Sequence, residues 1–344
     1  ALRGDDVLAP PPDRPWLLAP AEPLTDANAA DFLVPVIDQH IERVALPDQV
    51  FTSGLAIGLG HANLVELALP RATIDGASAA VWPRLTLEQL ELSAATLVPG
   101  VLAKIVDASP RLRGLTVTDT PLDAAAIDEI VALPALIALG ASGTGVTDLQ
   151  AARMVEHVGL EIVALARTGA GPQAAAMLGT AGLRELHLDD TKLDDGAAAK
   201  LAALAPTLER FTASRTRVGD RGLAWLPKAT LLRQLELADS EISDKLVRRL
   251  SLPALQEVDL GGRPITAATW IGLLGSAPDL AVAVLGPNAR VDDTVAAAVL
   301  AHPHLTALGL GDTSVTSAGL VGLAGTPLLR ERRDVEVGDL GATQ

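Results

Sequence analysis

The sequence contains no cysteine and no tyrosine, and aromatic residues make up only 2% of its 344 residues. The absence of cysteine excludes disulfide bonds, thiolate zinc sites and cysteine nucleophiles. Hydrophobic residues nevertheless reach 49%, so the core must be built from Leu, Ala, Val and Ile. This composition favours many similar thin layers over one large globular core.

Basic residues are also few, because 27 Lys and Arg stand against 42 Asp and Glu, for a formal net charge of −15. Nucleic-acid binding requires a cationic surface that displaces counterions from phosphates. We therefore expect no nucleic-acid partner, and an anionic membrane surface is disfavoured for the same reason. The acidic excess has two interpretations: it only keeps the protein soluble, or it forms an acidic patch that faces a basic partner.

Long apolar runs are missing as well. No segment approaches the roughly 18 apolar residues that a membrane helix needs, so we expect no membrane insertion. The first residues lack the basic-then-apolar pattern of a signal peptide, which favours the cytoplasm without fixing a compartment. The chain starts at Ala1 rather than at Met, so an earlier segment remains an alternative. The high Ala content, with Arg well above Lys, is typical of GC-rich bacterial genomes.

A leucine pattern recurs through most of the chain. Segments such as LRELHLDDTKL, from Leu183, and LRQLELADSEI, from Leu232, share the spacing L-x-x-L-x-L. The opening apolar position recurs at Ile41, Leu64, Leu87, Leu112, Leu136, Leu160, Leu183, Leu208, Leu232, Leu255, Leu280, Leu305 and Leu329. The mean step is 24 residues, and every step is 23 to 25. This periodicity predicts about 12 repeats over residues 41–328.

Each repeat is predicted to form a short strand, a turn and a helix. Leucines alternate with polar residues at its start, which is the period of a strand with one buried face. About eleven residues after the opening position comes a helix-capping residue. These residues are Asp75, Asp123, Thr147, Asp194, Ser243, Thr266, Asp292 and Thr316. Where Val98 and Gly171 take this place, Pro99 and Pro172 are expected to be the first helical residues.

The unit L-x-x-L-x-L-x-x-(T)-x-apolar resembles the leucine-rich repeat, and the resemblance covers residues 41–328. It implies an α/β solenoid shaped like a horseshoe, with a parallel sheet on the concave face, short helices on the convex face, and a role in protein recognition. The family's usual Asn at the ninth position is present only as Asn288. Threonine is the commonest residue there instead, at Thr120, Thr144, Thr168, Thr191, Thr216 and Thr313. A hydroxyl can make part of the hydrogen bonds that the Asn amide makes.

Two helix-start phrases point to a subclass. The segments at 195–198 and 220–223 resemble the openings of bacterial GALA-type and ribonuclease-inhibitor-like repeats.

The ends of the array need caps, because a solenoid exposes an apolar layer at each end. Residues 1–23 are predicted to be a proline-rich extended tail, in which Trp16 either packs on the first repeats or is recognised by a partner. Residues 24–40 are predicted to form a capping helix and partial repeat. Residues 329–344 turn polar and are predicted to form a C-terminal cap and tail that closes the sheet edge.

The densest polar cluster falls on repeats 7 to 10 of the expected concave face. Outward side chains of neighbouring strands lie one strand apart, so they can meet. The predicted partner-binding residues are Glu185, His187, Asp189, Asp190, Arg210, Thr212, Arg215, Glu236, Asp239 and Asp259. A mixed-charge face that contacts only solvent is the alternative interpretation of the same residues.

Two chemical alternatives use part of this cluster. Ser214, His187 and Asp189 are the residue types of a catalytic triad, but a flat sheet supplies neither an oriented base nor an oxyanion hole. His187 with Asp189, or Glu236 with Asp259, offers metal-ligand types without a recognised spacing. We therefore predict no catalytic residues, no metal and no cofactor, and a hydrolase or metal-dependent enzyme stays a distant third interpretation.

Two functions remain. The first is a non-enzymatic module that binds a partner protein through the concave face around repeats 7 to 10. The second is a structural scaffold or spacer that associates with copies of itself. Trp225 and Trp270 fall on helical segments and are expected to be buried, whereas exposed tryptophans would make the convex side the interface.

Overall fold

The computed structural model describes residues 18–25, 28–80, 82, 86–156 and 159–323. The chain divides into two compact units, Ala1–Thr168 (unit 1) and Gly169–Gln344 (unit 2). The proline-rich tail up to residue 17, with Trp16, and the polar segment 329–344 lie outside the described residues. The predicted division into tail, caps and array therefore stays a prediction.

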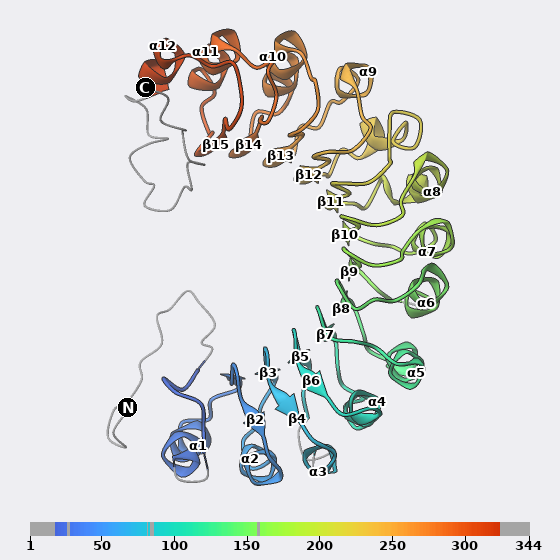
Figure 1. Ribbon diagram of the computed structural model, residues 1–344, viewed down its shortest axis with the longest axis vertical. Helices are drawn as coiled ribbons and strands as arrows, with labels where there is room; N and C mark the ends of the chain where they lie inside the picture. The colour runs from blue at the N-terminus through green and yellow to red at the C-terminus, as the bar shows by residue number, and fades with distance from the viewer. Residues whose placement is uncertain (1–17, 26–27, 81, 83–85, 157–158, 324–344) are drawn as a thin grey trace. The chain divides into compact units, whose positions relative to one another are not determined.

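Unit 1 alternates short parallel strands with helices (Figure 1). Its main strands are β1 (Arg43–Ala45), β3 (Glu66–Ala68), β5 (Gln89–Glu91), β7 (Gly114–Thr116), β8 (Ala138–Gly140) and β9 (Ile162–Ala164), paired in this order. Its helices are α1 (Ala29–Asp38), α2 (Ser53–Leu59), α3 (Gly76–Ala79), α4 (Val101–Asp107), α5 (Ala124–Ala132) and α6 (Asp148–Met154). The helices of this unit lie on the outer side of its strands.

A second, smaller parallel sheet in unit 1 was not predicted. It consists of β2 (Val50–Phe51), β4 (Thr73–Ile74) and β6 (Thr96–Leu97), each just before a helix. In the following repeat Pro121 occupies the corresponding position. Proline has no backbone N–H to donate to a sheet, which explains why the pairing ends at β6.

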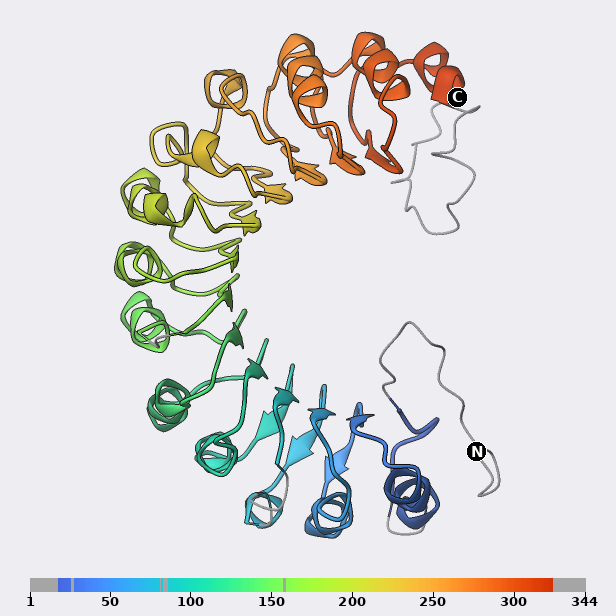
Figure 2. The ribbon, with the colours of Figure 1, turned by 180° about the vertical axis from the view of Figure 1, so that it is seen from behind.

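Unit 2 repeats the same order of elements (Figure 2). Its strands are β10 (Glu185–His187), β11 (Arg210–Thr212), β12 (Gln234–Glu236), β13 (Glu257–Asp259), β14 (Val282–Val284) and β15 (Ala307–Gly309), paired in this order. Its helices are α7 (Pro172–Leu178), α8 (Asp195–Ala198), α9 (Asp244–Val247), α10 (Ala267–Ser276), α11 (Asp293–Leu300) and α12 (Ser317–Leu323), with 3-10 helices at Ala199–Leu204 and Leu226–Lys228. In the described part of the chain, no helix has both the length and the apolar character needed to cross a membrane.

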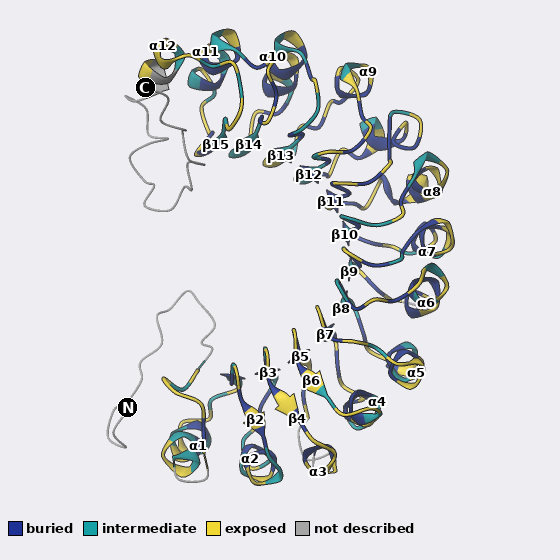
Figure 3. Cartoon of the chain, viewed as in Figure 1, coloured by how far each residue is buried: buried dark blue, intermediate teal, exposed yellow. Residues whose placement is uncertain are grey.

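The core of each unit lies between its strands and its helices, and the middle residue of most strands is buried in it (Figure 3). In unit 2, Leu186, Phe211 and Leu235 are in register across β10, β11 and β12, and all three are completely buried. Burying a side chain of this size contributes about 1.5–3 kcal/mol relative to leaving it exposed. The residues on either side of each middle residue point outward, as the alternating pattern predicts.

The tryptophans of unit 2 are in the core. Trp225 is 6% exposed and Trp270 is fully buried. The indole ring of Trp225 lies edge-on to Phe211, with 5.7 Å between the ring centroids. The predicted burial is confirmed. Neither tryptophan is exposed, so neither supports an interface on the helical side.

Most of the predicted helix caps are present. A side-chain oxygen accepts a backbone N–H at Asp75, Asp123, Thr147, Asp194, Ser243, Asp292 and Thr316. Thr266 occupies the cap position, but its hydroxyl contacts the hydroxyl of Thr269 at 3.0 Å instead. Pro172 is confirmed as the first residue of α7. The same prediction for Pro99 is wrong, because Gly100, with φ of 76°, follows it and precedes α4.

Hydroxyls at the ninth position form hydrogen bonds in the turns of several repeats. Five threonines donate to the carbonyl oxygen three residues earlier, at 2.6–2.9 Å: Thr144, Thr168, Thr191, Thr216 and Thr313. Ser240 makes the same bond at 2.7 Å, although the sequence pattern did not include it. Thr120 differs, because it donates at 2.6 Å to Leu92 of the preceding repeat. A hydroxyl thus satisfies a carbonyl that would otherwise be orphaned in the turn.

Carboxylates at the helix starts of unit 2 join neighbouring repeats. Oδ1 of Asp195 accepts the backbone N–H groups of Gly219 and Gly222, at 2.7 and 2.9 Å. Asp244 accepts the backbone N–H of Thr266 at 2.9 Å. The acidic helix-start phrases therefore act between repeats as well as at their own helix.

Candidate functional site

All ten predicted binding residues lie in unit 2, on β10 to β13 and on the turns that follow these strands. The strand register places His187 beside Thr212, Thr212 beside Glu236, and Glu236 beside Asp259. We call the outward side chains of β10 to β13 and of their following turns the unit 2 strand face. Its side chains form ion pairs, a hydrogen-bond chain and a group of carboxylates.

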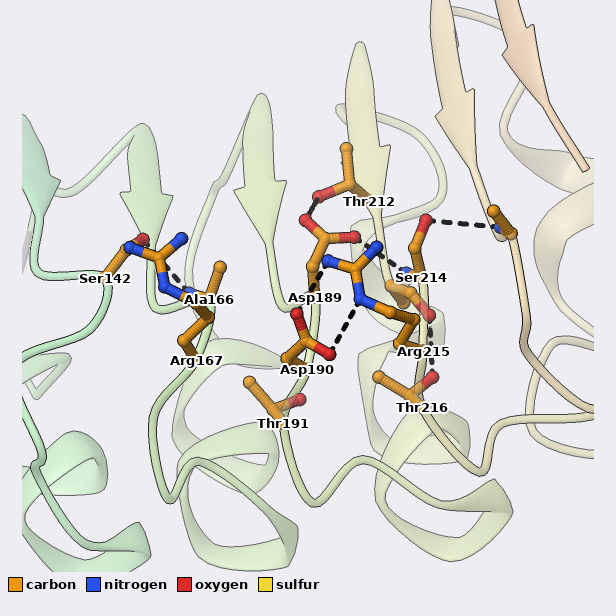
Figure 4. Close-up of polar contacts among 12 residues, drawn as sticks. Ser142, Ala166, Arg167, Asp189, Asp190, Thr191, Thr212, Ser214, Arg215 and Thr216 are labelled. Atoms are coloured by element: carbon orange, nitrogen blue, oxygen red, sulfur yellow. Dashed lines mark hydrogen bonds and ion pairs between the residues drawn. The ribbon is translucent and has the colours of Figure 1, made fainter. Parts of the chain in front are cut away.

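Two ion pairs cover β10 and β11. Arg210 contacts Glu185 at 2.9 Å from the neighbouring strand. Arg215 binds Asp190 with two parallel bonds, Nε to Oδ1 at 2.8 Å and the terminal nitrogen to Oδ2 at 2.6 Å (Figure 4). The hydrogen bond from Asp190 raises the pKa of Arg215 above its usual value. Because both arginines are about half exposed, each pair contributes about 0–1 kcal/mol and mainly fixes side-chain positions.

A hydrogen-bond chain runs between these pairs. The hydroxyl of Thr212 donates to Oδ2 of Asp189, and Oδ1 of Asp189 accepts the backbone N–H of Ser214 at 2.7 Å (Figure 4). Nδ1 of His187 lies 3.2 Å from the Thr212 hydroxyl. Because the single hydroxyl proton of Thr212 goes to Asp189, Nδ1 of His187 must be the donor in this contact. The imidazole is therefore oriented with its Nδ1–H toward Thr212.

The residues considered as a triad are not arranged as one. The hydroxyl of Ser214 accepts the backbone N–H of Ala238 at 3.2 Å, and His187 contacts Thr212 rather than Ser214. Asp189 faces Thr212 and the Ser214 backbone, so it does not orient the imidazole directly. A nucleophile–base hydrogen bond, which triad chemistry requires, does not connect these three side chains. Among the described residues, no group of three or more His, Asp or Glu side chains is placed to hold a metal ion.

Carboxylates dominate β12 and β13. Glu236 accepts the Gln234 amide at 2.6 Å, and Asp259 accepts the backbone N–H of Gly261 at 2.8 Å. Burial raises the pKa of Asp259, the Gly261 bond opposes this, and the charges of Glu236, Asp239 and Asp189 raise the pKa further. These carboxylates therefore act on one another, in contrast to the neutralised pairs on β10 and β11.

Sequence reasoning missed a third row of charges at the edge of this face. Glu209 lies between two arginines, 2.7 Å from Arg184 and 3.7 Å from Arg233. Each of the three residues directly follows the opening leucine of its repeat. The signal was available in the repeat register, but the prediction did not include the position directly after the opening leucine.

No family model and no curated protein matches this sequence. Solved structures do share its fold. Rad7, in a complex with Elc1 from yeast, has 17% identity and a TM-score of 0.58 over 86% of each chain. The LRR ectodomain of the Arabidopsis receptor kinase HAESA, in a complex with a peptide hormone, has 18% identity and a TM-score of 0.50 over 80% of this chain and 45% of that one.

A third solved structure is TLR13 in a complex with single-stranded RNA, at 15% identity and a TM-score of 0.53. The likeness covers 85% of this chain and 49% of TLR13. The chain thus spans about half of the TLR13 and HAESA chains. At these identities the likeness concerns the fold.

Proposed function

We propose that this leucine-rich-repeat protein binds another protein through the unit 2 strand face. The observation that carries the proposal is the concentration of chemistry on one part of the sheet. The outward row of unit 2 contains His187, Thr212, Glu236 and Asp259, whereas four of the six corresponding residues in unit 1 are alanine or glycine. Ordered polar side chains on a rigid sheet are typical of recognition surfaces.

The order of these side chains supports binding. The ion pairs and the chain from His187 through Thr212 to Asp189 fix the donors and acceptors before a partner arrives. A surface that is already ordered loses less conformational entropy on association.

Solved complexes of the same fold agree with a macromolecular partner. Rad7 is in a complex with Elc1, and HAESA with a peptide hormone. TLR13 is in a complex with RNA, which makes RNA the competing partner class. The net charge of −15 and the carboxylates of β12 and β13 favour a protein, because phosphates would be repelled.

A comparison of matched charge-reversal variants tests this proposal. The variant Arg210→Glu/Arg215→Glu reverses two ion-paired arginines of the unit 2 strand face. The control Arg71→Glu/Arg167→Glu reverses two ion-paired arginines on turns of unit 1. Each variant and the wild-type chain are immobilised, and captured proteins are quantified by mass spectrometry. We expect a set of proteins that the control retains and the unit 2 variant loses.

Equal capture by both variants would contradict the proposed face. Fluorescence anisotropy with a single-stranded RNA oligonucleotide tests the competing partner class. Salt-sensitive RNA binding that unit 2 charge reversal weakens would replace the protein partner with RNA. Light scattering over a concentration series tests the scaffold alternative. A mass that grows with concentration in the wild type but not in the unit 2 variant would assign the face to self-association.

A further inference from the structure

Unit 1 shows how a turn of this repeat holds a guanidinium. Asp119, Gly143 and Arg167 occupy the same turn position in three successive repeats, with φ of 55°, 68° and 55°. Arg167 reaches past Gly143 to Oδ1 of Asp119, at 2.7 Å. A Cβ atom on Gly143 would lie 1.9 Å from that oxygen and 3.1 Å from the Arg167 terminal nitrogen. The absence of a side chain at Gly143 is therefore what lets the carboxylate and the guanidinium meet.

Unit 2 repeats the first two parts of this arrangement. Asp239 and Gly262 have φ of 53° and 71°. A Cβ atom on Gly262 would lie 1.8 Å from Oδ1 of Asp239. The carboxylate of Asp239 thus takes the same place over a glycine as the carboxylate of Asp119 does in unit 1.

The third part, the arginine, is missing from unit 2. In unit 1 the N–H of Gly143 donates to Ala166, the residue before Arg167. In unit 2 the N–H of Gly262 donates to Pro287, which stands seven residues after the opening leucine of its repeat, as Arg167 does in unit 1. Asn288 is 6% exposed, and its amide donates inward to the Ile265 carbonyl at 2.7 Å. Within the described residues, no salt bridge or hydrogen bond involves the exposed Asp239 carboxylate.

The surroundings in unit 2 are more negative than those in unit 1. Glu236 and Asp259 precede Asp239 and Gly262 by three residues each, and the matching residues in unit 1 are Thr116 and Gly140. Two nearby arginines have other partners: Arg215 binds both carboxylate oxygens of Asp190, and Arg263, directly after Gly262, donates to the Ile242 carbonyl at 3.3 Å. An incoming cation would therefore meet three carboxylates with little competition from within the chain.

We propose that Asp239 and Gly262 bind an arginine side chain of the partner protein, and that Glu236 and Asp259 strengthen its attraction. This inference rests on the proposed function and names the chemistry that the partner must present. A guanidinium fits better than an ammonium, because it is planar and can lie flat over Gly262 while it donates to Asp239. The partner is thus a protein with an accessible arginine at its contact surface.

Titration of the full chain with N-acetyl-arginine N-methylamide, followed by amide chemical shifts, tests the site directly. The matched probes are the corresponding lysine compound and the citrulline compound, which keeps the shape of arginine without its charge. We expect saturable shifts at Gly262 and its neighbours with arginine, binding about fivefold or more weaker with lysine, and none with citrulline. Equal binding of arginine and lysine, or shifts with citrulline of the same size, would overturn the proposal.

Two variants localise the effect. Asp239→Asn removes the charge from an exposed side chain, so the amide spectrum should show that the fold is kept. We expect it to weaken binding of the arginine probe about tenfold. Asp312→Asn is the matched control, since Asp312 is exposed and has a similar φ of 51°, and it should leave the affinity unchanged. Equal effects of the two substitutions would mean that the probe responds only to net charge.

The two proposals fail in different ways. If the arginine probe binds at Gly262 but no protein is lost on unit 2 charge reversal, the protein-binding function fails. If capture depends on Arg210 and Arg215 but Asp239→Asn changes neither capture nor probe binding, the function stands and the arginine site is wrong.

Discussion

The two units share a repeat but differ in what their strands display. In unit 1 the outward row contains Ala45, Ala68, Glu91, Thr116, Gly140 and Ala164. In unit 2 the same row contains His187, Thr212, Glu236, Asp259, Val284 and Gly309. The buried middle residues of both units are aliphatic, apart from Phe211. The repeat thus constrains the inward positions and leaves the outward ones free to carry chemistry.

The units also differ in how repeats are joined at the helix starts. Unit 1 uses backbone pairing in its small sheet of β2, β4 and β6. Unit 2 has isolated backbone bridges there, such as Asp194–Arg217 and Gly219–Glu241, and adds carboxylates such as Asp195, which accept backbone N–H groups of the next repeat. Both solutions satisfy backbone donors that would otherwise be unpaired. In unit 2 side-chain acceptors thus add to a backbone pairing that is reduced to single bridges.

The largest expected effect concerns the aromatic core residue that sets unit 2 apart. Phe211→Ala should lower the free energy of unfolding by about 3–5 kcal/mol, because it opens a cavity beside Trp225. Phe211→Leu, which restores the residue type of unit 1, should cost less than about 1.5 kcal/mol. Urea denaturation followed by circular dichroism measures both. Equal losses of unfolding free energy in Phe211→Ala and Phe211→Leu would show that the ring contact with Trp225 matters more than the side-chain volume.

The next effect tests the carboxylate that joins two repeats. Asp195→Ala removes the acceptor of two backbone N–H groups and should cost about 1–3 kcal/mol. Thr73→Ala in unit 1 leaves the backbone pairing of β4 intact and should change stability by less than about 0.5 kcal/mol. Denaturation midpoints of the two variants give the comparison. A neutral Asp195→Ala would mean that these N–H groups find other acceptors.

Each unit has a buried Phe–Trp pair, Phe211 with Trp225 in unit 2 and Phe51 with Trp82 in unit 1, the latter with 5.3 Å between ring centroids. Nε1 of Trp225 donates to the Ala198 carbonyl at 3.0 Å, whereas Nε1 of Trp82 has no partner among the described residues. Both Trp→Phe substitutions remove similar volume, so their difference isolates the hydrogen bond. Trp225→Phe should be more destabilising than Trp82→Phe by about 1 kcal/mol in chemical denaturation. The opposite order would contradict this interpretation.

The smallest expected effect depends on pH. The folded pKa of Asp259 is raised above its usual 3.8, so the folded state favours the protonated carboxyl. The stabilisation linked to that proton is full below pH 3.8 and is lost as pH rises through the folded pKa. Asp259→Asn should therefore raise the unfolding midpoint near pH 7 but not below pH 3.8.

Glu91→Gln is the control for this charge removal, because its neighbours in the unit 1 row, Ala68 and Thr116, are uncharged. It should not raise the midpoint at either pH. If Glu91→Gln raised the unfolding midpoint near pH 7 as much as Asp259→Asn does, the effect would come from net charge rather than from the carboxylates of β12 and β13.

The sequence alone determined the repeat, its strand and helix order, most helix caps and the burial of both tryptophans of unit 2. These properties depend on local periodicity and on residue types that act within a few positions. It also determined which residues share the outward face, because alternation in a strand leaves no other choice.

Only the tertiary structure decided which outward side chains meet. The partners of Ser214 and His187 depend on how side chains of adjacent strands approach, which no single repeat encodes. The hydrogen bond from the Asn288 amide to the Ile265 carbonyl and the position of the Asp239 carboxylate over Gly262 likewise depend on how one repeat stacks on the next. The physical reason is that the repeat period is a local property of the sequence, whereas contacts between strands form only once the repeats are stacked.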